Sequence, residues 1–166
     1  SSPSRGLGDV YKRQFFYHRN IIINHRGVSL KIYPTQGAPQ GGVGSPLIFN
    51  LMADELIKMI KSVPEVKIGM YADDACIFST SSDPNVAVNR VQRALNKAME
   101  WGEENKLRFS PTKSMALCFT RRHKPKKPRN LKVHGQNIDY VKEARHLGVI
   151  VDPKLSWNRH INEKCK

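Results

Sequence analysis

Apolar residues recur along the chain at two different spacings, and these spacings predict short strands and longer helices. Two apolar runs at residues 21–23 and 28–33, separated by His-Arg-Gly, predict a strand pair. Residues 66–80 contain two runs with the β-branched and aromatic composition of a hairpin. Further strand pieces are expected near residues 113–120, 131–134, 138–142 and 145–151, with a turn at 135–137.

The predicted helices begin at recognisable start signals. A serine and a proline at residues 45–46 suit an N-cap and a first helical position, and helical apolar spacing continues to about residue 61. An aspartate and a proline at residues 83–84 repeat that signal, and the second helix is expected to end within residues 102–105. A third helix is expected from residues 156–157 onwards. This order predicts an α+β fold whose antiparallel sheet is covered by helices on one face.

The charge of the chain indicates a polyanionic partner. Lys and Arg number 28 against 14 Asp and Glu, so the formal net charge is +14. Nucleic acid is the first candidate, because release of phosphate counterions supplies affinity. An anionic membrane surface is less favoured, because the basic residues are spread along the whole chain and no apolar run is long enough to span a bilayer.

The cysteines favour a reducing compartment. Cys76, Cys118 and Cys165 show no metal-ligand spacing, and two of them lie in apolar runs. The N-terminus has no apolar signal core. We therefore expect buried thiols and an intracellular protein, nuclear or cytoplasmic and not secreted.

Two adjacent aspartates, Asp73 and Asp74, lie between the two apolar runs of residues 66–80. Apolar flanks of this kind are expected to bury both strands and to hold the carboxylates at the rim of the core. Neighbouring carboxylates repel each other, and a divalent cation such as Mg²⁺ relieves that repulsion. Asp-Asp is also ordinary turn chemistry, so a plain turn is the competing interpretation.

A glycine-rich loop at residues 36–46 precedes the first predicted helix. Glycines allow a backbone to approach a ligand closely, and a helix N-terminus favours anions. A mobile surface loop is the alternative. One helix and one strand separate this loop from the aspartates, which would return the chain to the same end of the sheet.

These two motifs together resemble the reverse transcriptase family. Gln-Gly-Ala-Pro-Gln-Gly-Gly-Val-Gly-Ser-Pro-Leu-Ile-Phe-Asn at residues 36–50, followed by Tyr-Ala-Asp-Asp at 71–74, is similar to the enzymes of non-LTR (LINE-type) retrotransposons. Group II intron reverse transcriptases are the nearest relatives that could be confused with them. Leu-Arg-Phe-Ser-Pro-Thr-Lys-Ser at 107–114 resembles the next family motif, and Arg-His-Leu-Gly-Val at 145–149, with Asp152, resembles the primer-grip hairpin.

The resemblance implies a right-hand polymerase palm over residues 15–152 and the start of a thumb at 153–166, with the fingers missing. It implies an RNA-directed DNA polymerase that extends a DNA primer on an RNA template, using dNTPs and two Mg²⁺ ions, or Mn²⁺. Asp73 and Asp74 would be catalytic metal ligands, and Lys113 would act near the pyrophosphate. The nucleotide and template pocket would be lined by Gln36, Gly37, Pro39, Gln40, Gly41 and Gly42, and the primer would contact Tyr71, His146, Leu147 and Gly148.

The chain departs from the family pattern upstream of the glycine loop. Reverse transcriptases carry another catalytic aspartate there, whereas the only acidic residue before Gln36 is Asp9. Residues 1–14 lack apolar periodicity and are expected to be a non-native or disordered leader. With one metal-ligand motif of two, we expect the 166-residue chain not to polymerise. Gly44 also replaces a residue that is usually leucine-like.

Residues 121–130 form a basic segment with two prolines. The segment could contact duplex phosphates or serve as a nuclear targeting signal, and a solvated insertion between strands is the favoured interpretation. Two other interpretations of the whole chain stay open. One is a non-catalytic nucleic-acid-binding module in which the aspartates are turn residues, and the other is a decayed retroelement remnant.

Overall fold

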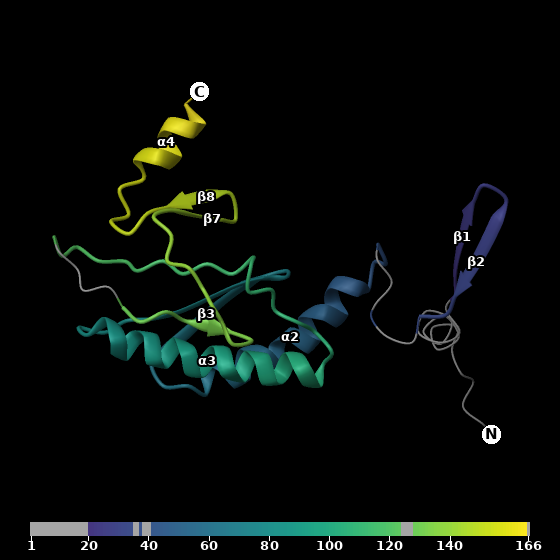
Figure 1. Cartoon of the computed structure of the whole chain (residues 1–166), viewed down its shortest axis with the longest axis horizontal. Coiled ribbons are helices and arrows are strands. Elements are labelled where there is room, and N and C mark those ends of the chain that lie inside the picture. The colour runs from purple at the N-terminus through teal and green to yellow at the C-terminus, as the bar shows by residue number, and fades with distance from the viewer. Residues whose placement is uncertain (1–19, 35–36, 38–40, 124–127, 166) are drawn as a thin grey trace, which may run out of the picture. The chain divides into compact units, whose positions relative to one another are not determined.

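The structure is a computed structural model that describes residues 20–34, 37, 41–123 and 128–165 (Figure 1). The chain separates into two units, Ser1–Ala53 and Asp54–Lys166, and each is described by itself. Along the described residues the elements are, in order, β1 (Ile21–His25), β2 (Val28–Ile32), α2 (Ser45–Lys61), β3 (Val66–Tyr71), β4 (Asp74–Ser79), α3 (Pro84–Glu104), β5 (Lys132–Val133), β6 (Gln136–Asn137), β7 (Ala144–His146), β8 (Val149–Val151) and α4 (Asn158–Lys164). The mixture of helices with antiparallel strand pairs agrees with the predicted α+β class.

The first unit contains the predicted strand pair as a hairpin. β1 is Ile21–His25 and β2 is Val28–Ile32, and the two strands are antiparallel. Arg26 and Gly27 between them have φ values of 46° and 81°, as a two-residue type I′ turn requires. All residues of both strands are exposed.

The two longer helices begin close to the predicted starts, and the cap signal of the second is confirmed. α2 is Ser45–Lys61 and α3 is Pro84–Glu104. Asp83 is the N-cap of α3, and its carboxylate accepts a hydrogen bond of 2.9 Å from the Asn85 N–H. α3 ends at the cap residue Asn105, which lies within the predicted limits.

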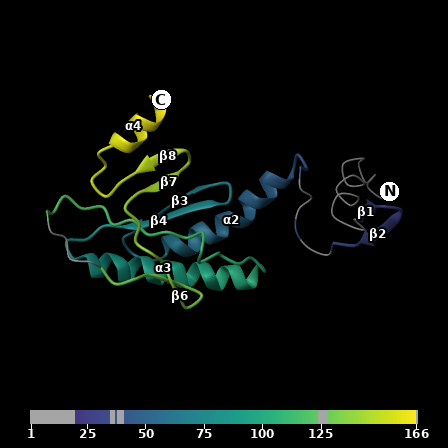
Figure 2. The same ribbon diagram turned by 45° about the horizontal axis from the view of Figure 1, so that its top comes forward.

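α3 organises the core of the second unit. Its small and aromatic face is buried at Ala94, Ala98 and Trp101, and the Trp101 indole N–H donates to Glu55 of α2 at 3.3 Å. Another face packs against a second buried cluster. That contact joins Val88, Val91, Leu95 and Met99 of α3 to Ala116, Leu131, Val133 and Ile138. Figure 2 shows the β3–β4 hairpin beside this helix and the β7–β8 hairpin beside α4.

The described strands form four separate two-stranded antiparallel sheets, where one sheet was expected. β3 (Val66–Tyr71) pairs with β4 (Asp74–Ser79), and two of the other three pairs involve strands of only two or three residues. Such short strands offer few backbone groups for a third strand. The short pairs are β5 (Lys132–Val133) with β6 (Gln136–Asn137), and β7 (Ala144–His146) with β8 (Val149–Val151).

The predicted strand at residues 113–120 is wrong. Its one ladder contact is an isolated parallel bridge between Ala116 and Tyr140, where the Ala116 N–H donates to the Asp139 carbonyl at 3.0 Å. The turn expected at residues 135–137 is also displaced. His134 and Gly135 form it, with φ values of 47° and 77°, and this leaves the next two residues free to pair as β6.

The expected burial of the β3–β4 strands is wrong as well. Val66, Ile68 and Met70 lie on the partly or fully buried side of β3, whereas the alternate residues are exposed. On β4, Phe78 is 45% exposed. The two faces differ because α3 packs against the hairpin and no other described element does so.

The expected burial of the thiols is also wrong, because Cys76 and Cys165 are exposed and Cys118 is half-buried.

The last helix, α4, is Asn158–Lys164 and begins after Trp157, whose φ of 63° is not helical. Across the described ranges, no helix combines the length and the apolar composition needed to cross a membrane.

Candidate active site

The two aspartates lie at the tip of the β3–β4 hairpin. Tyr71 pairs with Asp74 at the last position of the ladder, so Ala72 and Asp73 form the two-residue turn. Asp73 and Asp74 are both exposed. The structure therefore has the two carboxylates side by side at the end of a hairpin, as the sequence predicts.

The turn between the strands has an unusual backbone. Ala72 has a φ of 50°, a left-handed value that costs an L-residue about 1–2 kcal/mol. Asp73 is outside the positive-φ region, so only the first turn residue is left-handed, as in a type II′ turn, where glycine is preferred. The tip thus adopts a conformation that its own residues do not favour, and the surrounding structure must stabilise it.

The carboxylates of Asp73 and Asp74 are available to a ligand. Neither side chain forms an ion pair or hydrogen bond with another residue in the part of the chain that the structure describes. Within those same residues, no third His, Cys, Asp or Glu completes a metal cluster. Two adjacent carboxylates match the oxygen ligands that Mg²⁺ and Mn²⁺ take, with the remaining positions left to water or phosphate oxygens.

Tyr71 lies on the open face of the hairpin beside the carboxylates. Its side chain is 69% exposed, and it is the cross-strand neighbour of Asp74. Gly69 and Cys76 pair on the same face, and a Cβ added at Gly69 would meet no atom within 4 Å. Desolvation by surrounding protein atoms raises the pKa of the Cys76 thiol, although the residue as a whole is exposed. This face therefore offers an accessible aromatic ring next to the aspartates.

The glycine loop is described only in part. Gln36, Pro39 and Gln40 lie outside the described residues. Gly37 and Gly41 are exposed with φ values of 80° and 78°. The Gly42 carbonyl accepts a hydrogen bond of 3.0 Å from the Ser45 N–H, so the loop leads directly into α2. The loop belongs to the first unit and the aspartates to the second, so their predicted proximity stays a prediction.

Lys113 lies in a turn and not at the start of a strand. The turn is closed by Ser114, whose N–H and hydroxyl both donate to the Ser110 carbonyl, at 3.1 and 2.8 Å. Lys113 is exposed, and no hydrogen bond or ion pair connects it to Asp73 or Asp74 within the described chain. Its predicted role near the pyrophosphate stays a prediction.

Three of the four predicted primer-binding residues, His146, Leu147 and Gly148, lie at the tip of the β7–β8 hairpin. His146 pairs with Val149, and the turn residues Leu147 and Gly148 have φ values of 49° and 80°. Leu147 is 51% exposed. These three residues are brought together in a tight turn at Leu147 and Gly148.

A second turn follows this hairpin. The Asp152 carboxylate accepts hydrogen bonds from the Lys154 N–H at 2.8 Å, and from the N–H and hydroxyl of Ser156 at 2.9 Å each. Partial desolvation acts in the opposite direction, but these bonds lower the pKa of Asp152. Asp152 therefore organises the connection from β8 to α4.

The described ends of the basic segment are fixed beside the start of α3. Arg122 donates to the Ser82 carbonyl at 3.2 Å, and the Arg129 N–H donates to the Asn85 side chain at 3.2 Å. Residues 124–127 lie outside the described part. Arg121 and Arg129 are exposed, so the segment presents positive charge from a defined place on the surface.

Sequence reasoning missed a contact at the other end of the β3–β4 hairpin, between Arg90 of α3 and Glu65. No local pattern links two residues so far apart in the chain. An exposed acidic residue directly before a strand was the only available signal, and it is a weak one.

Comparisons with known proteins agree with the resemblance. The family model described as reverse transcriptase (RNA-dependent DNA polymerase) matches residues 7–151. A 115 kDa protein in the type-1 retrotransposable element R1DM of Drosophila melanogaster is 26% identical over 151 residues, which are 90% of this chain and 14% of that protein. The RNA-directed DNA polymerase from mobile element jockey of the same organism is 26% identical over 154 residues, 90% of this chain and 17% of its own length.

The chain therefore spans 14% and 17% of the length of these two relatives. No solved structure matches it. The family match covers both the glycine loop and the aspartate hairpin, and the relatives come from R1 and jockey, which are non-LTR retrotransposons. This chain belongs to the reverse transcriptase (RNA-dependent DNA polymerase) family.

Proposed function

We propose that this chain is the palm and the beginning of the thumb of an RNA-directed DNA polymerase that extends a DNA primer on an RNA template. The observation that carries the proposal is the pair of exposed carboxylates at the tip of the β3–β4 hairpin, which have no ion-pair partner among the described residues. Family membership supplies the reaction class, since residues 7–151 match reverse transcriptases.

Asp73 and Asp74 hold the divalent cation in this proposal. When bound, Mg²⁺ lowers the pKa of the primer hydroxyl and neutralises charge on the phosphates. The hairpin contributes the oxygen ligands, and no described cationic side chain forms an ion pair with them. Tyr71, exposed beside Asp74, is positioned to contact the primer end.

The other predicted residues complete the proposal. Lys113 donates charge or a proton to the leaving pyrophosphate, and the exposed tip of the β7–β8 hairpin, His146 to Gly148, holds the primer strand. The glycine loop at residues 36–42 accommodates the incoming nucleotide and template. The exposed cations of this strongly basic chain bind nucleic-acid phosphates.

The 166 residues by themselves do not extend a primer in this proposal. The described residues supply two carboxylates from a single motif, and residues 10–35 contain no Asp or Glu. A primer-extension assay on the purified chain should give no product above a no-protein control. Robust incorporation of dNTPs would overturn this part of the proposal.

The assignment of the metal ligands is tested in an intact polymerase that carries this segment. Asp73→Asn should reduce primer extension by at least about 10²-fold, because a charge that stabilises the transition state is removed. Nucleic-acid binding, measured by fluorescence anisotropy, should be unchanged. Asp139→Asn is the matched control, since Asp139 is exposed and distant in sequence from the hairpin. Full extension by the Asp73→Asn enzyme would contradict the assignment.

A further inference from the structure

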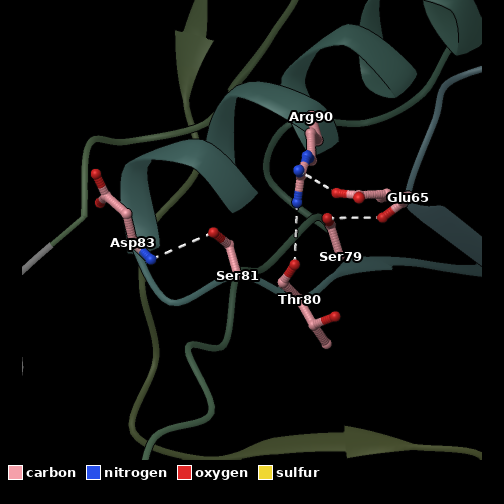
Figure 3. Close-up of polar contacts among 6 residues, drawn as sticks. All are labelled: Glu65, Ser79, Thr80, Ser81, Asp83 and Arg90. Atoms are coloured by element: carbon pink, nitrogen blue, oxygen red, sulfur yellow. Dashed lines mark hydrogen bonds and ion pairs between the residues drawn. The ribbon is translucent and has the colours of Figure 1, made fainter.

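A single guanidinium connects both strand ends at the open end of the β3–β4 hairpin (Figure 3). Arg90 extends from α3 and forms an ion pair with Glu65, the residue before β3. The same side chain donates to the carbonyl of Thr80, the residue after β4, at 3.1 Å. We call these three residues the hairpin clamp.

The strand ends are also tied to each other. Ser79 pairs with Val66 in the last position of the ladder, and its hydroxyl donates to the Glu65 carbonyl at 2.8 Å. The connection to α3 is short, and the Asp83 N–H donates to the Ser81 hydroxyl oxygen at 3.2 Å within it. Figure 3 shows Arg90 pointing from the helix toward Glu65 and Thr80, so the clamp fixes both strands to one helix.

Anchoring of the hairpin is concentrated at this end. Val66 beside the clamp is buried, whereas Ile68 and Met70, on the same face of β3 and nearer the tip, are only half-buried. The side chain of Arg90 is 26% exposed and that of Glu65 is 63% exposed, so the arginine is held against the protein while the carboxylate stays open to solvent. The tip therefore projects from a fixed base.

Small rotations at such a base become large displacements at the tip. β3 has six residues, so the tip lies about 20 Å from the base at about 3.3 Å per residue. A rotation of about 3° would move the carboxylates by about 1 Å, and a misplacement of that size can reduce catalysis about 10²-fold.

We infer that Arg90 is a positioning residue that sets the direction of the β3–β4 hairpin and so places Asp73 and Asp74 in the active site. The inference rests on the proposed function of those aspartates. Arg90 does not touch substrate or metal; it acts through the backbone of both strands. A lysine could replace its charge but not its two separate nitrogen contacts.

The direction of the hairpin can be measured in the purified chain without any activity. Cys76 is exposed on β4 and accepts a spin label, and Asn89→Cys supplies a second label site on α3, with Cys118 and Cys165 changed to serine. Arg90→Met should broaden the electron–electron distance distribution between the labels, with unchanged helix content by circular dichroism. Arg159→Met is the matched control, because Arg159 of α4 also forms an ion pair, with Glu143, and is not part of the clamp.

Kinetics in an intact polymerase that carries this segment supply the second measurement. At a temperature where all variants are folded, Arg90→Met should lower kcat by about 10- to 100-fold. KM for the primer–template should stay within about twofold, because the variant leaves the nucleic-acid contacts in place. Arg90→Lys should recover part of the lost kcat. Glu65→Gln, at an exposed position, should give a smaller loss and replaces Arg90→Met if that variant does not fold.

The outcomes separate the two proposals. A narrow distance distribution and a normal kcat for Arg90→Met, in an enzyme that Asp73→Asn inactivates, would overturn the role of Arg90 alone. Activity that survives Asp73→Asn would overturn the proposed function itself. A loss of kcat equal in Arg90→Met and Arg159→Met would show general destabilisation and would also overturn the positioning role.

Discussion

The β3–β4 and β7–β8 hairpins are built in opposite ways. β7–β8 has strands of three residues, joined by a two-residue turn in which Leu147 and Gly148 both have a positive φ. β3–β4 has strands of six residues, and its turn has a positive φ at Ala72 without any glycine. Among the four described hairpins, the other three all have glycine as the second turn residue.

This difference shows at which hairpin the turn residues adopt a backbone conformation that their side chains disfavour. In β7–β8, Gly148 favours the type I′ geometry at the second turn position and Leu147 adopts a positive φ beside it. In β3–β4 the tip carries two carboxylates and a left-handed alanine, and the longer ladder, α3 and Arg90 compensate for it. Conflicts between local and global preferences are expected where residues serve chemistry.

The largest change in stability is expected when α3, the support of β3–β4, is disturbed. A Cβ at Gly102 would lie 2.6 Å from the Leu107 carbonyl oxygen and 3.2 Å from the Phe109 ring. Gly102→Ala should therefore destabilise the chain by about 2 kcal/mol, because overpacking exceeds the gain in helix propensity. Urea denaturation measures this, and hydrogen exchange should show a greater loss of protection in β3–β4 than in β7–β8.

The control for this variant is a glycine on the hairpin itself. Gly69→Ala places a Cβ where nothing lies within 4 Å, so its effect on unfolding should be within about 0.5 kcal/mol. Equal effects of the two alanines would contradict the account of α3 as the support.

Exchanging the turn chemistry tests the comparison directly. Gly148→Ala adds no contact within 4 Å, so its expected cost of about 1 kcal/mol comes from the left-handed backbone alone. Ala72→Gly should have the opposite sign and stabilise the chain by about 0.5–1 kcal/mol, because it relieves the strain at the tip. Thermal unfolding of both variants gives the sign of each change in stability. A destabilised Ala72→Gly chain would show that the tip is not strained.

The smallest expected effect is a loss of local stability at acidic pH. The Arg145 guanidinium, through its hydrogen bond, lowers the pKa of Glu163 on α4, and the pKa of Asp152 is also lowered. A lowered pKa in the folded chain contributes stability that is present above the ordinary values of 4.5 and 3.8 and is lost as pH falls below them. Hydrogen exchange in β7–β8 and α4 should therefore lose protection in that range.

Asp152→Asn tests the origin of that pH dependence. The variant should weaken the response of the β8–α4 connection to acid, whereas Asp139→Asn, away from that connection, should keep the wild-type response. An unchanged acid response in Asp152→Asn would show that the hydrogen bonds at Asp152 do not stabilise the segment.

The helices and the aspartate hairpin were predictable because their signals are local. The Asp83-Pro84 start and the apolar spacing fixed α3, and the apolar runs around Asp73 fixed the hairpin and its tip. Residues 113–120 are apolar too, but strand formation depends on a partner strand, and only Ala116 finds one. Pattern alone cannot show which apolar run will be paired.

Side-chain exposure and long-range contacts were the other features that the sequence did not predict correctly. Cys76 lies in an apolar run but faces away from α3, and only the three-dimensional arrangement decides which strand face is covered. Arg90 and Glu65 meet because the hairpin folds back onto the helix that follows it. The closeness of the glycine loop to Asp73 remains a prediction.

The central claim is that the tip of β3–β4 holds a divalent cation through its two carboxylates. The most direct measurement is an NMR titration of the purified chain with Mn²⁺, which broadens signals near the bound ion. We expect broadening centred on the backbone amides of Tyr71 to Ala75, and its loss in the Asp73→Asn, Asp74→Asn double variant. Broadening centred elsewhere, or unchanged in that variant, would contradict the account.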